Sequence, residues 1–185
     1  KDKKKVNRIQ VALLLPFMTN ETTQSSATSR FVEYYEGLLL AVDSLRNMGT
    51  SIELSVYDTG NGTKKVKEIL KEDALSNANL IIGAVQNDQI GLIADFAQKH
   101  NIKYVIPFTS KNDDVLSNAN VYQVNTPHSY LYSKAAQAGC DLFSDYNIIL
   151  VNIKDKEEKP EFIKAFKTEM QQRDIPFKEV TYKGD

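Results

Sequence analysis

The triplet Asp58-Thr59-Gly60 directly follows an alternating apolar run, which is how an aspartic protease introduces its catalytic carboxylate. In such enzymes two carboxylates about 3 Å apart share one proton, because two like charges that close together cannot both ionise. The chain holds no second Asp-Thr-Gly or Asp-Ser-Gly triplet, so a twofold partner would have to supply it. Apolar side chains at helical spacing follow Gly62. We therefore interpret Asp58 as the end of a strand that feeds a helix through a glycine turn.

Motifs of other enzymes and of cofactor sites are missing. The first apolar run leads into LLLPFMTN, which is neither a GxGxxG turn nor a Walker loop, and no GxSxG elbow is present. The hydroxyl-rich segment 19–29 would suit a flavin phosphate, but it contains no glycine. His100 and His128 have no His or Cys partner at ligand spacing, and the single cysteine, Cys140, lies on an apolar helical stripe. We expect no catalytic residue, no metal and no cofactor, which favours a binding module over an enzyme.

Polar side chains follow two of the predicted buried strands. Ligands of open parallel sheets bind beyond the carboxyl ends of the strands, where hydroxyls and turn N–H groups can hold a carboxylate or a hydroxyl. In the first of these loops, Asn87 or Asp88 is in the place of a cap for the helix that begins there, which is the favoured interpretation, and one residue can both cap the helix and contact a ligand. The candidate ligand-binding residues are Gln86, Asn87, Phe108, Thr109 and Ser110.

Strands and helices alternate along the chain. The strand that begins at Ile9 is almost continuously apolar up to Pro16, which is typical of a strand covered on both faces of a sheet. Regular alternation with short connections predicts an α/β fold with a doubly wound parallel sheet. We expect further strands at 52–57, 80–85, 103–106, 121–124, 147–153 and 177–182, and helices at 30–49 (with Gly49 as a cap), 64–76, 88–100, 128–144 and 159–173.

Composition restricts the classes of partner. The 185 residues are 42% hydrophobic, enough for one domain or two small ones. With 23 basic and 24 acidic residues the net charge is -1, which gives no general attraction to nucleic acid or to an anionic membrane. No apolar run approaches the roughly 20 residues of a membrane helix. The opening residues 1–8 are charged and unpatterned, as expected for a basic, solvated linker.

The order and spacing of several blocks resemble the type I periplasmic binding fold, the branched-chain amino-acid receptor group of substrate-binding proteins. The resemblance implies a first Rossmann-like lobe at 9–125 and a partial second lobe at 126–185, because a complete two-lobed receptor is nearly twice as long. It also implies that Asp58 is structural, since the second strand of that family commonly ends in Asp-Thr before a helix. The blocks are VALLLPF, EGLLLAVDSLRNMG, IELSVYDTGN, the long stretch 80–110, VYQVNTPHS and NIILVNIKD.

The resemblance also suggests how a ligand is held. In the receptors a polar residue at the position of Asn87 grips the ligand, together with backbone and hydroxyl groups at the positions of Phe108 and Ser110. The second lobe contributes an aromatic turn of the Tyr-Gly-x-Gly kind, whereas this chain has KDKEEKPEF, with neither Tyr nor Gly. Phe108 is bulkier than the residues usual at its position and would fill the pocket.

The implied function is a non-catalytic, extracytoplasmic ligand-binding domain of the bacterial periplasm or cell envelope. Its partner would be a small polar solute or an envelope component such as a peptidoglycan fragment, bound in the cleft between the lobes. Similar chains stand behind LysM repeats in envelope proteins, and penicillin-binding-protein activators share the fold. The alternative is therefore an envelope interaction scaffold, with an envelope protein as partner, or a regulator of peptidoglycan synthesis with a vestigial pocket.

The last two predicted strands, 147–153 and 177–182, have apolar faces and open edges. Two strands alone are marginally stable, and open edges invite pairing with another chain. We expect a homodimer built mainly from residues 128–182, by sheet extension or by exchange of the second-lobe segment.

Overall fold

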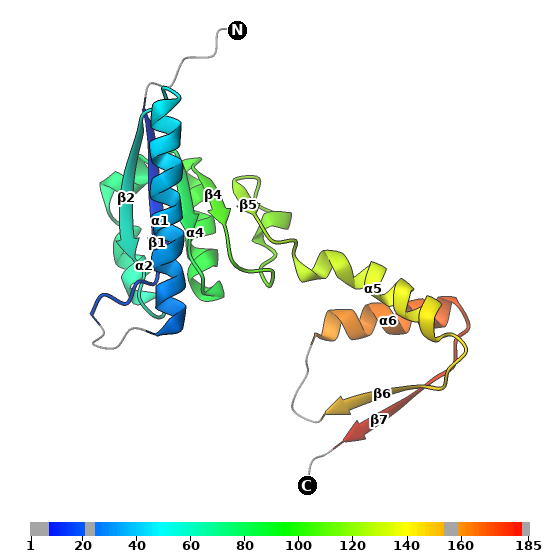
Figure 1. Cartoon of the computed structure of the whole chain (residues 1–185). Coiled ribbons are helices and arrows are strands. Elements are labelled where there is room, and N and C mark those ends of the chain that lie inside the picture. The colour runs from blue at the N-terminus through cyan, green and yellow to red at the C-terminus, as the bar shows by residue number, and fades with distance from the viewer. Residues whose placement is uncertain (1–7, 21–24, 154–158, 183–185) are drawn as a thin grey trace. The chain divides into compact units, whose positions relative to one another are not determined.

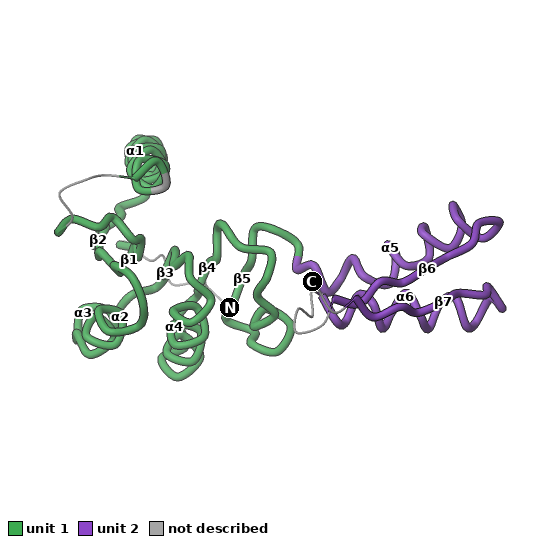
Figure 2. The backbone as a smooth tube through the Cα atoms, turned by 90° about the horizontal axis from the view of Figure 1, so that it is seen from below, with its two compact units in different colours: residues 1–126 green, residues 127–185 purple. Residues whose placement is uncertain are grey.

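The computed structural model of the chain describes residues 8–20, 25–153 and 159–182 (Figure 1). They form two compact units, residues 1–126 and 127–185, and each unit is described by itself (Figure 2). All of the predicted linker except Arg8, and most of the segment compared with the aromatic turn of the second lobe, lie outside the described residues.

The first unit is built on a parallel sheet of five strands in the order β2-β1-β3-β4-β5, which confirms the predicted α/β fold class. The chain passes from β1 to β2 on one side and then returns to β3 on the other side, so the strand order reverses between β1 and β3. This is the switch point at which open α/β sheets bind ligands. The strands are β1 (Ile9–Leu15), β2 (Ile52–Asp58), β3 (Leu80–Gly83), β4 (Lys103–Ile106) and β5 (Val121–Gln123).

Helices cover both faces of this sheet. Helix α1 (Ser26–Asn47) lies over β1 and β2 on one face, and α2 (Lys64–Ile69), α3 (Asp73–Ser76) and α4 (Asn87–His100) lie on the other face (Figure 2). A short 3-10 helix, η1 (Asp114–Leu116), precedes β5.

Helix α1 begins four residues earlier than predicted. The Ser25 side chain caps it by accepting a 3.2 Å hydrogen bond from the backbone N–H of Thr28. At the other end Gly49 has a φ of +88°, and the N–H groups of Gly49 and Thr50 donate to the carbonyls of Arg46 and Leu45. This is the glycine-terminated helix end that the sequence predicted.

The helix predicted at 64–76 is wrong, because the structure has two short helices there. Glu72 is extended, with φ −75° and ψ 127°, and this break lets α3 place Leu75 in the core with no exposed surface. The sequence also gave no sign of η1. The Asn112 side chain supports its start by accepting a 3.0 Å hydrogen bond from the N–H of Asp114.

The core forms on both faces of β1, whose side chains alternate between the two clusters. Ala12 and Leu14 face α2, α3 and α4, whereas Val11, Leu13 and Leu15 face α1. All five are buried, as predicted for a strand covered on both sides.

The neighbouring strand β3 approaches β1 very closely at Gly83. A Cβ atom at Gly83 would lie 1.8 Å from the carbonyl oxygen of Leu14, and the φ of Gly83 is +119°. Only glycine fits at this point of the sheet, where the strand order reverses.

The second unit contains α5 (His128–Phe143), β6 (Ile148–Ile153), α6 (Pro160–Gln172) and β7 (Phe177–Tyr182). Strands β6 and β7 pair in parallel, and both helices lie on the same face of this small sheet (Figures 1 and 2). The helices touch where a Cβ at Gly139 would lie 2.8 Å from the Phe166 ring. Cys140 is buried in this contact, as predicted, and burial raises the pKa of its thiol.

Candidate ligand-binding site

Asp58 is the last residue of β2, and its carboxylate accepts hydrogen bonds from the loop after β1 and from the loop after β2. Its Oδ1 accepts hydrogen bonds from the N–H groups of Met18 at 3.1 Å and Gly60 at 3.0 Å. Its Oδ2 accepts from the N–H of Thr19 at 3.1 Å, from the Thr19 hydroxyl at 2.8 Å and from Lys65 Nζ at 3.0 Å. The carboxylate therefore holds the loop after β1 against the start of α2.

These donors also fix the charge of Asp58. Partial burial by itself raises the pKa of the carboxyl. The backbone N–H groups of Thr19 and Gly60, the Lys65 ammonium and the Thr19 hydroxyl together outweigh burial and hold the pKa well below its usual range. A carboxylate held ionised by five donors is a structural group and is unsuited to sharing a proton, as the dyad of an aspartic protease must.

Two glutamines brace the loop after β2 from the side of α4. Gln86 Oε1 accepts a 2.9 Å hydrogen bond from the N–H of Gly62, and its Nε2 donates to Asn61 Oδ1 at 3.0 Å. Gln89 Nε2 donates to the carbonyls of Gly60 at 3.2 Å and Gly62 at 2.8 Å. The predicted ligand-binding residue Gln86 thus also positions a neighbouring loop.

Gln89 was not predicted to matter, although the sequence carried a signal for it. It stands one helical turn before Ile93 on the buried stripe of α4, and its side chain has no exposed surface. A polar residue on an apolar stripe has to find hydrogen-bond partners inside the protein.

Helix α4 begins differently from the prediction that Asn87 or Asp88 caps it. Gln86 occupies the N-cap position, its side chain makes no capping bond, and Asn87 and Asp88 are the first two helical residues. Both are exposed. Among the described residues the Asn87 side chain makes no hydrogen bond, so its amide is open to an external partner.

The loop after β4 carries the other three predicted residues. The Phe108 ring packs edge-to-face against Phe31 at 5.6 Å and Tyr34 at 4.8 Å between ring centroids, so it belongs to the core on the α1 side. The hydroxyl oxygen of Thr109 accepts a 3.0 Å hydrogen bond from the N–H of Lys111, which shapes a turn. Thr109 and Ser110 are half-buried.

All five candidate residues follow neighbouring strands. Strands β3 and β4 pair in parallel, with Leu80 opposite Lys103 and Ile82 opposite Val105. The loop with Gln86 and Asn87 and the loop 107–110 therefore leave the same edge of the sheet, beside the switch point.

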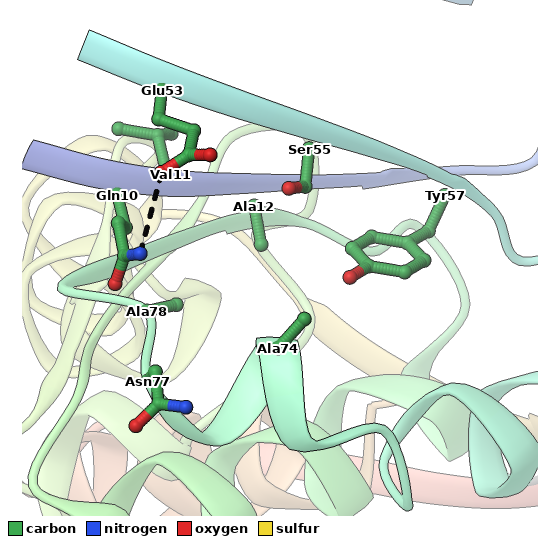
Figure 3. A pocket seen from close by; sticks show the side chains of 9 residues that line it. All are labelled: Gln10, Val11, Ala12, Glu53, Ser55, Tyr57, Ala74, Asn77 and Ala78. Carbon is green, nitrogen blue, oxygen red and sulfur yellow. Dashed lines mark hydrogen bonds between the residues drawn. The ribbon is translucent and has the colours of Figure 1, made fainter.

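One pocket of the first unit lies away from the candidate residues, and none of these five residues lines it. It measures about 110 Å³ and opens between α3 and the first two strands, where Gln10 Nε2 donates to Glu53 Oε2 at 3.3 Å (Figure 3). Over the described residues no three His, Cys, Asp or Glu side chains gather in a way that could hold a metal ion. In the same part of the chain no helix is both long and apolar enough to cross a membrane.

Known proteins match this chain in structure, whereas the sequence comparisons give no match. No family model matches the sequence, and no curated protein matches it. A substrate-binding protein of an ABC transporter from Desulfitobacterium hafniense, solved with leucine, matches 96% of this chain with a TM-score of 0.65 and 15% identity. The chain has the type I periplasmic binding fold.

Other structures of this fold give the same match. The branched-chain amino acid substrate-binding protein of Streptococcus pneumoniae, solved with isoleucine, has a TM-score of 0.58 and 13% identity over 96% of this chain and 50% of its own. A solute-binding protein from R. palustris, solved with benzoate, has a TM-score of 0.58 and 19% identity over 94% of this chain and 48% of its own. The chain spans about half of the length of these type I structures, including 52% of the D. hafniense protein.

Proposed function

We propose that the chain is the solute-binding part of a non-catalytic, extracytoplasmic protein of the periplasm or cell envelope. The open Asn87 amide at the start of α4 is the observation that carries this proposal. Asn87 follows β3, and the turn with Thr109 and Ser110 follows β4, so these residues lie at the same edge of the sheet. Hydrogen-bond donors fixed on braced loops bind a polar solute without reorganising, which is what a binding site requires.

The proposed solute is small and carries a carboxylate. Amide and hydroxyl donors beside the first turn of a helix favour a negative charge. The similar structures described above were solved with leucine, isoleucine and benzoate, each of which carries a carboxylate. The hydrogen bonds that Gln86 and Gln89 make to the loop after β2 support the same proposal, because they hold the segment that carries Asn87 in place.

A second candidate function is an envelope scaffold whose pocket is vestigial. The packing of the Phe108 ring against Phe31 and Tyr34 favours it, because this ring takes up space beside the proposed donors. Under this alternative the partner is an envelope protein, and the chain acts as an interaction scaffold or as a regulator of peptidoglycan synthesis.

Thermal unfolding with a panel of compounds distinguishes the two candidates. The panel contains leucine, isoleucine, benzoate and soluble peptidoglycan fragments. A ligand present at about 100 times its dissociation constant adds roughly 2.7 kcal/mol to the free energy of unfolding. We expect one of the three carboxylates to stabilise the protein, and the Asn87→Ala and Ser110→Ala variants to lose most of that gain.

A matched control lies on the same helix. Gln98 is exposed near the end of α4, so Gln98→Ala should retain the full ligand effect. Stabilisation by no compound at all contradicts the carboxylate proposal and favours the scaffold, whereas stabilisation only by peptidoglycan fragments contradicts the carboxylate proposal and favours an envelope component as the ligand. A carboxylate effect that survives both Asn87→Ala and Ser110→Ala would place the site elsewhere.

A further inference from the structure

Asn61 and Gly62 form the only Asn-Gly pair of the sequence and lie in the loop between β2 and α2. Asn61 is exposed to solvent. An Asn-Gly pair can cyclise, because glycine has no side chain that would keep its backbone nitrogen away from the asparagine side chain. The loop after β2 therefore carries residues capable of a spontaneous covalent modification.

The modification needs water and no other reactant. The Gly62 nitrogen gives its proton to solvent and bonds to Cγ of Asn61. The bond from Cγ to Nδ2 breaks, and the leaving nitrogen takes a proton from solvent and departs as ammonia. Water then opens the succinimide ring at either of its two carbonyls, which yields aspartate or isoaspartate. Both products carry a carboxylate in place of the amide, and isoaspartate also adds a methylene to the backbone of the loop.

The Gln86 side chain pairs with both reacting groups at once. Its Oε1 accepts a 2.9 Å hydrogen bond from the N–H of Gly62, and its Nε2 donates to Asn61 Oδ1 at 3.0 Å. Hydrogen bonds to an amide carbonyl lie near the plane of the amide, so the pairing turns the edges of both groups towards Gln86. Attack by the nitrogen has to come at the face of the Asn61 amide. The bond between Gly62 and Gln86 must therefore break before the ring can close.

Gln89 restrains the backbone on the other side of Asn61. Its Nε2 donates to the carbonyls of Gly60 at 3.2 Å and Gly62 at 2.8 Å. The Gly60 carbonyl belongs to the peptide plane before Asn61, and the Gly62 N–H belongs to the plane after it. A residue has only two soft backbone dihedrals, which set the angle between these two planes. Because α4 holds both planes, rotation of Asn61 towards ring closure costs hydrogen bonds.

We propose that Asn61 is a latent site of succinimide formation and that Gln86 sets the rate of its conversion. While the Gln86 amide pairs with the loop, Asn61 persists. When the pairing opens, Asn61 cyclises as an unrestrained Asn-Gly pair does. Isoaspartate lengthens the backbone between Gly60 and Gly62, so the product does not restore the same set of bonds to α4. The conversion thus records the opening of this loop permanently.

The proposal goes beyond solute binding and does not depend on it. Gln86 is also a candidate ligand-binding residue, but the restraint on Asn61 consists of contacts within the first unit alone. The experiment therefore contains no solute. Either proposal can fail while the other stands.

Peptide mass spectrometry after incubation at mildly alkaline pH measures the conversion of Asn61, and chromatography separates isoaspartate from aspartate. We expect the folded natural chain to convert about tenfold more slowly than the same chain unfolded in guanidinium chloride, because opening costs the contribution of two hydrogen bonds. The Gln86→Ala variant should convert about fivefold faster than the natural chain when both are folded, with an unchanged far-ultraviolet circular dichroism spectrum. Gln98→Ala is the matched control, because Gln98 is exposed near the end of α4 and should leave the rate unchanged.

The comparison of the folded with the unfolded natural chain needs no variant. A folded rate equal to or higher than the unfolded rate overturns the proposal, because the contacts with α4 would then not restrain Asn61. Equal rates for folded Gln86→Ala and the natural chain also overturn it, because the restraint would then come from other residues.

Discussion

Replacing Asp58 with asparagine tests whether its carboxylate holds the loop after β1 against the start of α2. The asparagine keeps one acceptor for Met18 and Gly60 but turns the other oxygen into an NH2 group. Of the three donors that this group faces, the N–H of Thr19 and the Lys65 ammonium cannot accept a hydrogen bond, so both of these bonds are lost, whereas the Thr19 hydroxyl can turn to accept one. A hydrogen bond to a charged acceptor contributes roughly 1.5–3 kcal/mol, and a partly exposed ion pair contributes at most about 1 kcal/mol. We expect Asp58→Asn to lower the free energy of unfolding by about 2–4 kcal/mol at pH 7.

The cost of Asp58→Asn should depend on pH. The pKa of Asp58 is lowered in the folded state, so its contribution is fully present above the pKa of the unfolded carboxyl, about 4. The contribution is lost as the pH falls from there through the folded pKa. The difference in stability between the natural chain and the variant should therefore shrink steadily below about pH 4.

Urea unfolding followed by circular dichroism measures this difference, since the chain has no tryptophan for fluorescence. Asp95→Asn is the matched control, because Asp95 is exposed on α4 and makes no ion pair among the described residues. A loss of less than 0.5 kcal/mol in Asp58→Asn, equal to that of the control, would refute the bracing role. Neither the natural chain nor Asp58→Asn should show peptidase activity. Pepstatin-sensitive cleavage by the natural chain would support the protease hypothesis instead.

Other substitutions probe the same edge. Gly83→Ala should cost at least about 3 kcal/mol or prevent folding, because the added Cβ meets the Leu14 carbonyl oxygen. Gly91→Ala in α4, where a Cβ meets nothing within 4 Å, should be neutral or stabilise by up to about 1 kcal/mol, and equal effects of the two would contradict this account. Gln89→Ala should cost about 2–4 kcal/mol, since it empties space in the core and leaves two loop carbonyls without their donor. Faster exchange of the Gly62 amide in this variant would report the loosened loop, and unchanged exchange would speak against it.

Much of the fold could be predicted from local patterns. The apolar run that starts at Ile9 and the alternation of strands with helices are enough to indicate a parallel sheet, and Gly49 marked a helix end correctly. The start of α1 was missed because Ser25 lies in a hydroxyl-rich segment that is typical of a loop. The break after α2 was missed because no glycine or proline marks it, and it depends on the burial of Leu75 in the folded core.

The positions of the candidate residues could be predicted from the sequence more easily than their contacts. Loops that follow neighbouring parallel strands must share an edge, so the position of Asn87 and Ser110 followed from strand order. The partners of Gln86 and Gln89 could not be predicted, because these side chains bond to a loop more than twenty positions away in the chain. The packing of Phe108 against α1 likewise depends on tertiary structure.

Amide chemical shifts of the isotopically labelled protein, titrated with leucine, isoleucine and benzoate, test the central claim most directly. The account predicts saturable shifts for one of these carboxylates at Asn87, Thr109 and Ser110, with the amides of β6 and β7 unaffected. Shifts confined to the pocket beside Gln10 and Glu53, or no saturable shift with any of the three compounds, would contradict the proposed solute binding at the carboxyl edge of the sheet.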